Sequence, residues 1–96
     1  MNDQDYQLVI KTLEQYTRVV SDQDIKDIVC IISFITDNNK IQWEDIPTVR
    51  TILSAVKFIY TEWIEKTNAH DYPDREMFQN FYREKINDIE IVLQKL

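Results

Sequence analysis

The 96-residue chain contains no glycine. Glycine adopts a positive φ more readily than any other residue, and tight hairpins, phosphate-binding loops and nucleophile elbows all need that conformation. The Walker, dinucleotide-binding and G-x-S-x-G motifs are therefore excluded. A chain of this length buries roughly 60 to 65% of the surface that its unfolded form exposes, which supports one core without a disulfide or a metal. We expect a single helical domain over 1–96.

Apolar residues recur at steps of three and four in four segments, as is typical of amphipathic helices. The sequence predicts helices over about 3–20, 21–36, 46–67 and 72–96. Their apolar stripes form the predicted core: Tyr6, Val9, Ile10, Leu13, Tyr16, Val20; Ile25, Ile28, Val29, Ile32, Ile35; Val49, Ile52, Leu53, Val56, Ile59, Tyr60, Trp63, Ile64; Phe78, Tyr82, Ile86, Ile89, Leu93 and Leu96.

Residues that start and stop helices separate these segments. The candidate N-caps are Asn2 or Asp3, Ser21 with Asp24 in an approximate capping box, Asp45 and Asp71. Pro47 and Pro73 are placed in first turns, and Asp37-Asn38-Asn39 is the strongest turn signal. The predicted fold is a compact all-α four-helix bundle, packed either orthogonally or up and down.

One alternative concerns the apolar run from Ile28 to Ile35, which is rich in β-branched residues and could form a buried strand. A lone strand has no partner here, because no other segment alternates with a period of two. We therefore prefer the helix. Cys30 lies inside the run and is predicted to be a small core side chain.

Catalytic chemistry has few candidates, because the chain has one histidine and one cysteine. His70, Asp71 and Asp74 could hold a surface cation, but the two carboxylates have a simpler role at the start of the last helix. The segment that begins at Asp37 resembles a calcium loop, yet it lacks the required glycine and has Thr48 at the twelfth position. We expect no enzymatic activity, no cofactor and no metal.

The charge balance of 11 − 17 = −6 argues against direct nucleic-acid binding. The densest acidic surface comprises Asp22, Asp24 and Asp27. It suggests a second possible function, in which the chain is an acidic inhibitor or nucleic-acid mimic that occupies the basic site of a DNA- or RNA-binding protein. The acidic N-terminus does not resemble a signal peptide, and the longest apolar stretch is too short to cross a membrane, so we expect a cytoplasmic protein.

Several large apolar residues lie off the predicted core stripes. Phe34 and Phe58 fall about 150° and 160° from the centres of their apolar faces, and Met77, Phe81 and Ile91 form a second stripe on the last helix. Aromatic and methionine side chains are enriched at the centres of protein interfaces. We therefore expect a non-enzymatic protein-binding module that docks a partner protein or a second copy of itself as a homodimer. Its composition suits a phage or mobile-element factor, an immunity protein or a subunit of a larger complex.

Overall fold

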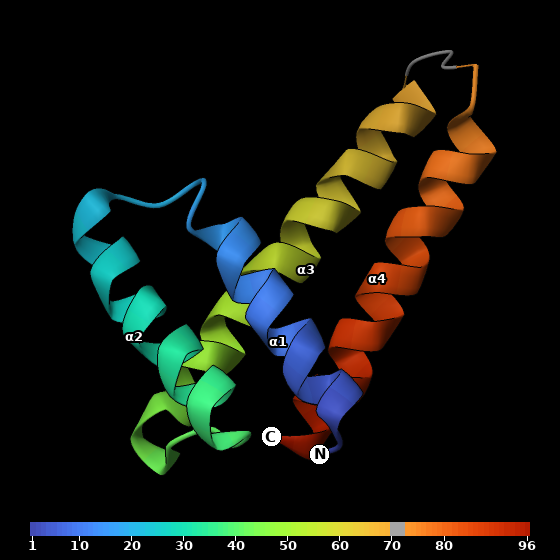
Figure 1. Ribbon diagram of the computed structural model, residues 1–96. Coiled ribbons are helices and arrows are strands. Elements are labelled where there is room, and N and C mark those ends of the chain that lie inside the picture. Colours follow the sequence, from blue (N-terminus) through green and yellow to red (C-terminus); the bar gives the residue numbers. More distant parts are fainter. Residues whose placement is uncertain (70–72) are drawn as a thin grey trace.

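The computed structural model describes residues 1–69 and 73–96, and it confirms the all-α four-helix bundle (Figure 1). The described residues contain no strand, so the segment from Ile28 to Ile35 is helical. In chain order the elements are α1 (Asp3–Tyr16), α2 (Asp22–Asn38), the short 3-10 helix η1 (Trp43–Asp45), α3 (Ile46–Ala69) and α4 (Arg75–Lys95).

The two long helices α3 and α4 run side by side as an antiparallel pair, and α1 crosses them at the end that holds both chain termini (Figure 1). The second helix, α2, packs mainly against α1 and lies on the far side of α1 from α4 (Figure 1). The other helices therefore pack at one end of the α3–α4 pair, and the opposite end of the pair projects beyond them.

The core lies where α1 crosses its neighbours, and every helix contributes to it. The largest fully buried side chains are Val9, Leu13, Ile35, Val49, Leu53, Ile89 and Val92. Six of these seven belong to the predicted stripes, and Val92 was not predicted. Burial of such side chains is the main force that holds short helices in place.

Two helix ends are formed by asparagine. Asn2 caps α1 as predicted, with its side chain accepting a 2.9 Å hydrogen bond from the backbone N–H of Asp5 in a complete capping box. Asn39 ends α2 in the left-handed conformation, with φ of 51°. This position usually carries glycine, and asparagine is the best substitute in a chain without glycine.

The predicted cap of α2 is partly wrong. Ser21 occupies the N-cap position, but its hydroxyl makes no cap hydrogen bond and instead donates to the carboxylate of Asp24 over 3.2 Å. Pro47 is the second residue of α3 and confirms the predicted first turn, and Asp45 lies in η1 directly before it.

Two predicted boundaries are also wrong. The first helix ends at Tyr16 instead of about Val20, because residues 17–19 form a tighter turn in which the Thr17 hydroxyl donates to the Glu14 carbonyl. The last helix begins at Arg75 instead of 72, and Asp74 takes its N-cap position without a side-chain cap bond. The predicted cap Asp71 lies outside the described residues.

The predicted burial of Val29 and Cys30 is wrong as well, since both side chains are exposed. Because α2 lies at the edge of the bundle, only the face with Ile28, Ile31 and Ile35 is buried. Cys30 lies about 200° around the helix from Ile28 and therefore faces solvent.

Candidate protein-binding surface

The α3–α4 pair extends well beyond α1. The two long helices contain 24 and 21 residues, whereas α1 contains 14. The last turn of α1 reaches Tyr60, where the Tyr60 hydroxyl donates a hydrogen bond to the side chain of Gln15. At about 1.5 Å per residue, α3 continues about 13 Å past that point with only α4 beside it (Figure 1).

Five aromatic side chains gather on this projecting part, and we call them the aromatic patch: Tyr60, Trp63, Phe78, Phe81 and Tyr82. Tyr82 is at the centre, with ring centroids 5.2 Å from Tyr60, 5.3 Å from Trp63, 5.8 Å from Phe78 and 5.3 Å from Phe81. The planes are tilted or edge-on, which is the favoured arrangement for aromatic pairs. The patch is therefore a packed cluster, not a set of isolated side chains.

Three of the five rings are open to solvent: Trp63 is 42% exposed, Phe78 50% and Phe81 54%. The prediction that Trp63 and Phe78 belong to the core is therefore wrong, although both lie on the core-facing stripes of their helices. They are uncovered because α1 ends too early to reach them. The side of the helix pair that α1 covers near the chain termini is therefore exposed to solvent beyond the end of α1.

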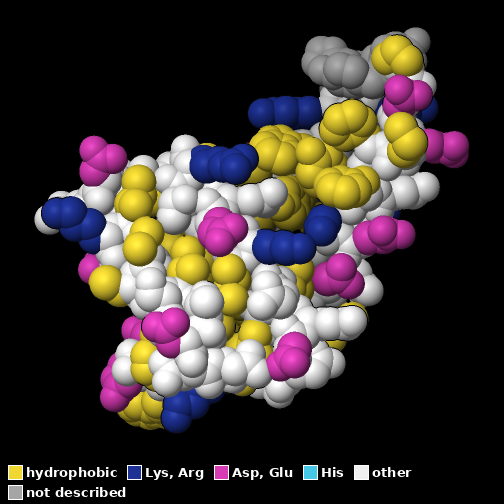
Figure 2. Space-filling view, in the orientation of Figure 1, with side chains coloured by type: hydrophobic (Ala, Val, Ile, Leu, Met, Phe, Trp, Pro, Cys, Tyr) yellow, Lys and Arg dark blue, Asp and Glu magenta, His cyan; other side chains and the backbone are white. Residues whose placement is uncertain are grey.

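The patch borders two hollows, and Figure 2 shows a broad hydrophobic area on this part of the face in view. A hollow of about 380 Å³ is lined by Trp63, Lys66, Thr67, Phe78 and Tyr82. A second hollow, of about 170 Å³, lies between α1 and α3, and its lining includes Val19, Ile59 and again Trp63. Trp63 therefore separates two depressions that side chains of a bound protein could enter.

A polar network fixes the helix pair beside the patch. The Gln79 amide, which is buried, donates to the Thr67 hydroxyl over 3.0 Å and to the Asn68 side-chain carbonyl over 2.6 Å. Arg83 donates to the Gln79 carbonyl over 3.3 Å. These bonds join α3 to α4 in a region that has no third helix, so the aromatic side chains stand on a constrained backbone.

Basic side chains line the border of the patch. Lys66 lines the larger hollow, Arg18 lines the smaller one, and the Lys85 ammonium lies 5.5 Å from the centre of the Phe81 ring. None of the described residues that line either hollow is a carboxylate, although the chain has 17 acidic residues against 11 basic ones. Figure 2 shows dark blue side chains beside the hydrophobic area, and magenta side chains also lie near it.

The residues that were predicted to form an interface lie on different parts of the structure. Phe81 belongs to the patch, and Met77, 67% exposed, lies one helical turn before it on the same side of α4. Phe58 is 62% exposed, but it lies on the outer face of α3, about 200° around the helix from Tyr60. Ile91 is exposed near the other end of α4, and Phe34 is half-buried in α2. The predicted acidic residues Asp22, Asp24 and Asp27 are all exposed on α2.

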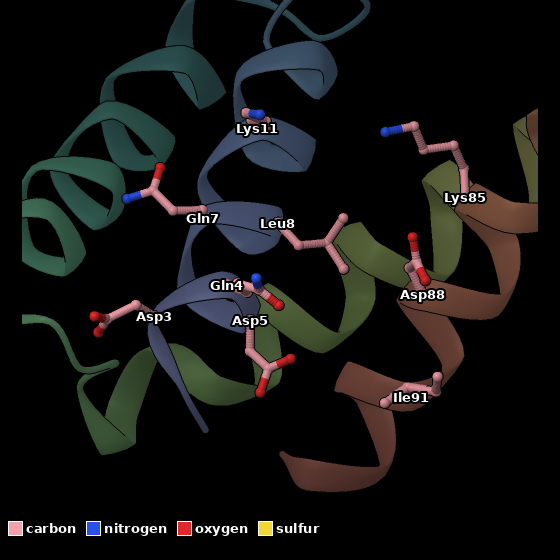
Figure 3. Close-up of a pocket in the computed structure, with 9 residues that line it drawn as sticks. All are labelled: Asp3, Gln4, Asp5, Gln7, Leu8, Lys11, Lys85, Asp88 and Ile91. Atoms are coloured by element: carbon pink, nitrogen blue, oxygen red, sulfur yellow. The ribbon is translucent and has the colours of Figure 1, made fainter.

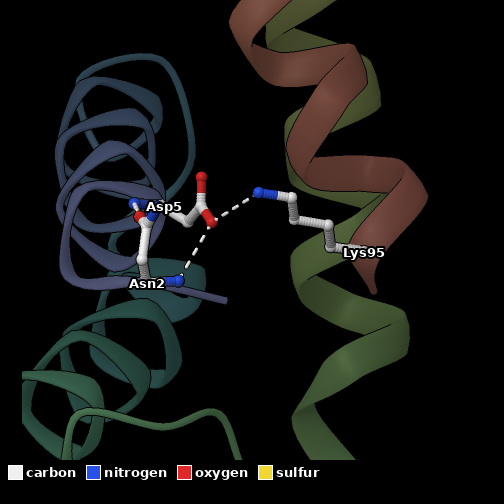
Figure 4. Close-up of polar contacts among 3 residues, drawn as sticks. All are labelled: Asn2, Asp5 and Lys95. Carbon is white, nitrogen blue, oxygen red and sulfur yellow. Dashed lines mark hydrogen bonds and ion pairs between the residues drawn. The ribbon is translucent and has the colours of Figure 1, made fainter.

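Ile91 lines a third depression, a groove of about 480 Å³ between α1 and α4 (Figure 3). Its charged lining is mixed, with Asp3, Asp5 and Asp88 against Lys11 and Lys85. The groove ends near the Asp5 carboxylate, which lies 2.9 Å from the Lys95 ammonium and 3.1 Å from the Asn2 backbone nitrogen (Figure 4). These donors lower the pKa of Asp5, and the Lys95 hydrogen bond is the main cause.

Among the described residues, no group of three histidine, cysteine or acidic side chains is arranged to hold a metal ion. The cation site considered at His70 and Asp71 lies outside those residues. No helix within them is long and apolar enough to cross a membrane. In comparisons with models of protein families, with curated proteins and with solved structures, nothing matches this chain.

Sequence reasoning missed Trp63 and Phe78 as surface residues. A signal for them exists in the order of residue types, because aromatic side chains concentrate in the parts of the third and fourth helices nearest their connection. The buried apolar residues of the core are aliphatic apart from Tyr60. A local change from aliphatic to aromatic on a core stripe therefore indicates a surface of partial burial.

Proposed function

We propose that this chain is a non-enzymatic protein-binding module and that the aromatic patch is its binding surface. The observation that carries the proposal is the exposure of Trp63, Phe78 and Phe81 in one packed cluster. Tryptophan, tyrosine and arginine dominate the energetics of protein interfaces, and the important residues cluster in pockets that lose their water on binding. A contiguous apolar surface of this kind on a soluble domain is typical of an interaction site.

Three further features support the proposal. The two helices that carry the rings are joined by the hydrogen bonds of Gln79, so binding needs little ordering of the backbone. The hollow of about 380 Å³ beside Trp63 and Phe78 has the dimensions to receive apolar side chains of a partner. Met77 extends the apolar surface on α4, and methionine adapts its shape to the surface that it contacts.

The test compares the wild-type chain with a variant that combines Phe78→Ala and Phe81→Ala. Tagged protein is used to capture partners from cells that express the chain, and light scattering after size exclusion measures its mass over a dilution series. We expect the double substitution to reduce the captured partner, or a self-associated form, by at least about tenfold, since each ring contributes at the scale of an interface hot spot.

The matched control combines Phe58→Ala with Trp43→Ala. Both side chains are exposed aromatics, but Phe58 lies on the outer face of α3 and Trp43 in η1, at the opposite end of α3 from the patch. The control should bind like the wild type, and circular dichroism should show that all three proteins are folded. The proposal is wrong if the Phe78 and Phe81 variant keeps the same partners and the same mass as the wild type.

A further inference from the structure

The border of the aromatic patch indicates the chemistry of its partner. Arg18 comes from the turn after α1, Lys66 from α3 and Lys85 from α4, and all three lie beside the rings of the patch. Within the described residues none of the three forms an ion pair, although Lys57 and Lys95 both do. Among these residues, no carboxylate neutralises the positive charge at this border through an ion pair.

We propose that the aromatic patch binds an acidic amphipathic segment of a partner protein, whose apolar side chains enter the hollow beside Trp63 and whose carboxylates meet Arg18, Lys66 and Lys85. This inference rests on the proposed function and adds the charge and shape of the partner. The larger hollow is open, lined by Trp63, Phe78 and Tyr82, and has Lys66 at its edge. An amphipathic helix offers this combination, with apolar anchors on one side and acidic residues beside them.

The overall charge of −6 does not oppose such a partner at short range. Charges are screened over about 8 Å at physiological salt, so the side chains at the border dominate the field at the patch. The described lining of both hollows contains no carboxylate. The charge of the remaining surface instead disfavours binding of acidic segments elsewhere on the chain, which improves specificity.

A second copy of the chain is a poorer occupant. A symmetric dimer centred on the patch would place the same surface of both copies face to face. The cations at the border of both copies would then lie in one interface, and like charges across an interface are unfavourable. A partner with carboxylates at those positions has no such cost.

An anionic membrane surface is also a poorer occupant. Aromatic rings with lysines are found on membrane-binding surfaces, and each cation contributes about 1 kcal/mol there. A flat lipid surface cannot fill a hollow of about 380 Å³, whereas a protruding side chain can.

The test is a selection of random peptides of about 16 residues, displayed on yeast, for binding to the full-length chain. The enriched peptides are expected to combine net negative charge with aromatic or leucine residues at helical spacing. The most enriched peptides are then synthesised, and their affinities are measured for four proteins: the wild type, the Phe78→Ala and Phe81→Ala variant, and two charge-reversal variants.

The first charge-reversal variant combines Lys66→Glu with Lys85→Glu, and the second combines Lys26→Glu with Arg50→Glu. Both change the net charge by the same amount, but Lys26 and Arg50 are exposed on α2 and near the start of α3, away from the patch. We expect at least about tenfold weaker binding from the first and less than about twofold from the second. If the first variant fails to fold, Lys66→Gln with Lys85→Gln replaces it.

The outcomes separate this inference from the proposed function. Enriched peptides that need Phe78 and Phe81 but carry no negative charge, or that tolerate reversal of Lys66 and Lys85, overturn the acidic partner and leave the binding surface intact. Both proposals are overturned if the enriched peptides bind the Phe78 and Phe81 variant and the Lys66 and Lys85 variant as well as the wild type. They are also overturned if no peptide is enriched. The acidic partner is also overturned if light scattering finds a dimer that depends on Phe78 and Phe81, or if vesicles containing phosphatidylserine bind through Lys66 and Lys85.

Discussion

The hydroxyl of Tyr60 on α3 donates a hydrogen bond to the side-chain carbonyl oxygen of Gln15 in the last turn of α1. The centre of the Tyr60 ring also lies 5.2 Å from the centre of the Tyr82 ring. Tyr60 is buried, whereas Trp63, one turn further along α3, is exposed. The contact with Gln15 therefore marks the border between the core and the aromatic patch.

We predict that Tyr60 makes the fold sensitive to alkali. Burial raises the pKa of the Tyr60 phenol above its ordinary value of 10.0, and the nearby Tyr82 adds to the shift. Because the folded-state pKa is raised, the protonated phenol makes its full contribution to the free energy of unfolding below pH 10. This contribution is lost as the pH rises through the folded-state pKa. Urea unfolding between pH 8 and pH 11 should show this loss in the wild type and a smaller one in Tyr60→Phe. Equal pH dependence in both proteins would contradict the prediction.

The ends of the chain are joined by an ion pair that should respond to acid. The Lys95 and Asn2 hydrogen bonds lower the pKa of Asp5 below 3.8, so the ion pair stabilises the fold above that pH. The stabilisation is lost as the pH falls through the lowered pKa. Unfolding free energies measured from pH 6 to pH 2 should fall less for Asp5→Asn than for the wild type. Asp27→Asn, in the exposed middle of α2, is the control and should follow the wild type.

Asn39 offers a test of the left-handed end of α2. Asn39→Ala should lower the free energy of unfolding by about 1 kcal/mol more than Asn39→Gly, because only alanine has a Cβ that conflicts with φ of 51°. Both variants lose the 2.6 Å hydrogen bond from the Asn39 amide to Asp3, so their difference isolates the backbone term. Chemical denaturation of the three proteins measures it, and equal stability of the alanine and glycine variants would contradict this explanation.

Most of the fold could be predicted from the sequence, because the period of apolar residues identifies the buried face of each helix without knowledge of its neighbours. Val9, Leu53 and Ile89 lie on predicted stripes and are fully buried. The start of α1 could be predicted, because Asn2 belongs to the few residue types that are preferred at the N-cap of a helix. The end of α1 was not, because it depends on how the chain turns toward α2.

The candidate binding surface was less predictable, and the reason is geometric. Periodicity shows which side of a helix is apolar, but it does not show how far along that side a neighbouring helix extends. Extending α1 from Tyr16 to Val20 would add about 6 Å of helix, which is slightly more than one helical turn. The error in the end of α1 and the error in the burial of Trp63 therefore have one origin. The exposure of Phe81 could be predicted, because this residue lies off the stripe.

The last prediction compares two apolar side chains on α3 that lie five residues apart. Leu53 is fully buried, whereas Phe58 is 62% exposed on the outer face. Leu53→Ala should lower the free energy of unfolding by about 2 to 5 kcal/mol, since it removes buried methyl groups and leaves a cavity. Phe58→Ala should change it by no more than about 0.5 kcal/mol, because little of that ring leaves water on folding. Chemical denaturation measures both. A large loss from Phe58→Ala would show that this ring is buried in solution, and it would then no longer serve as the control for the patch variants.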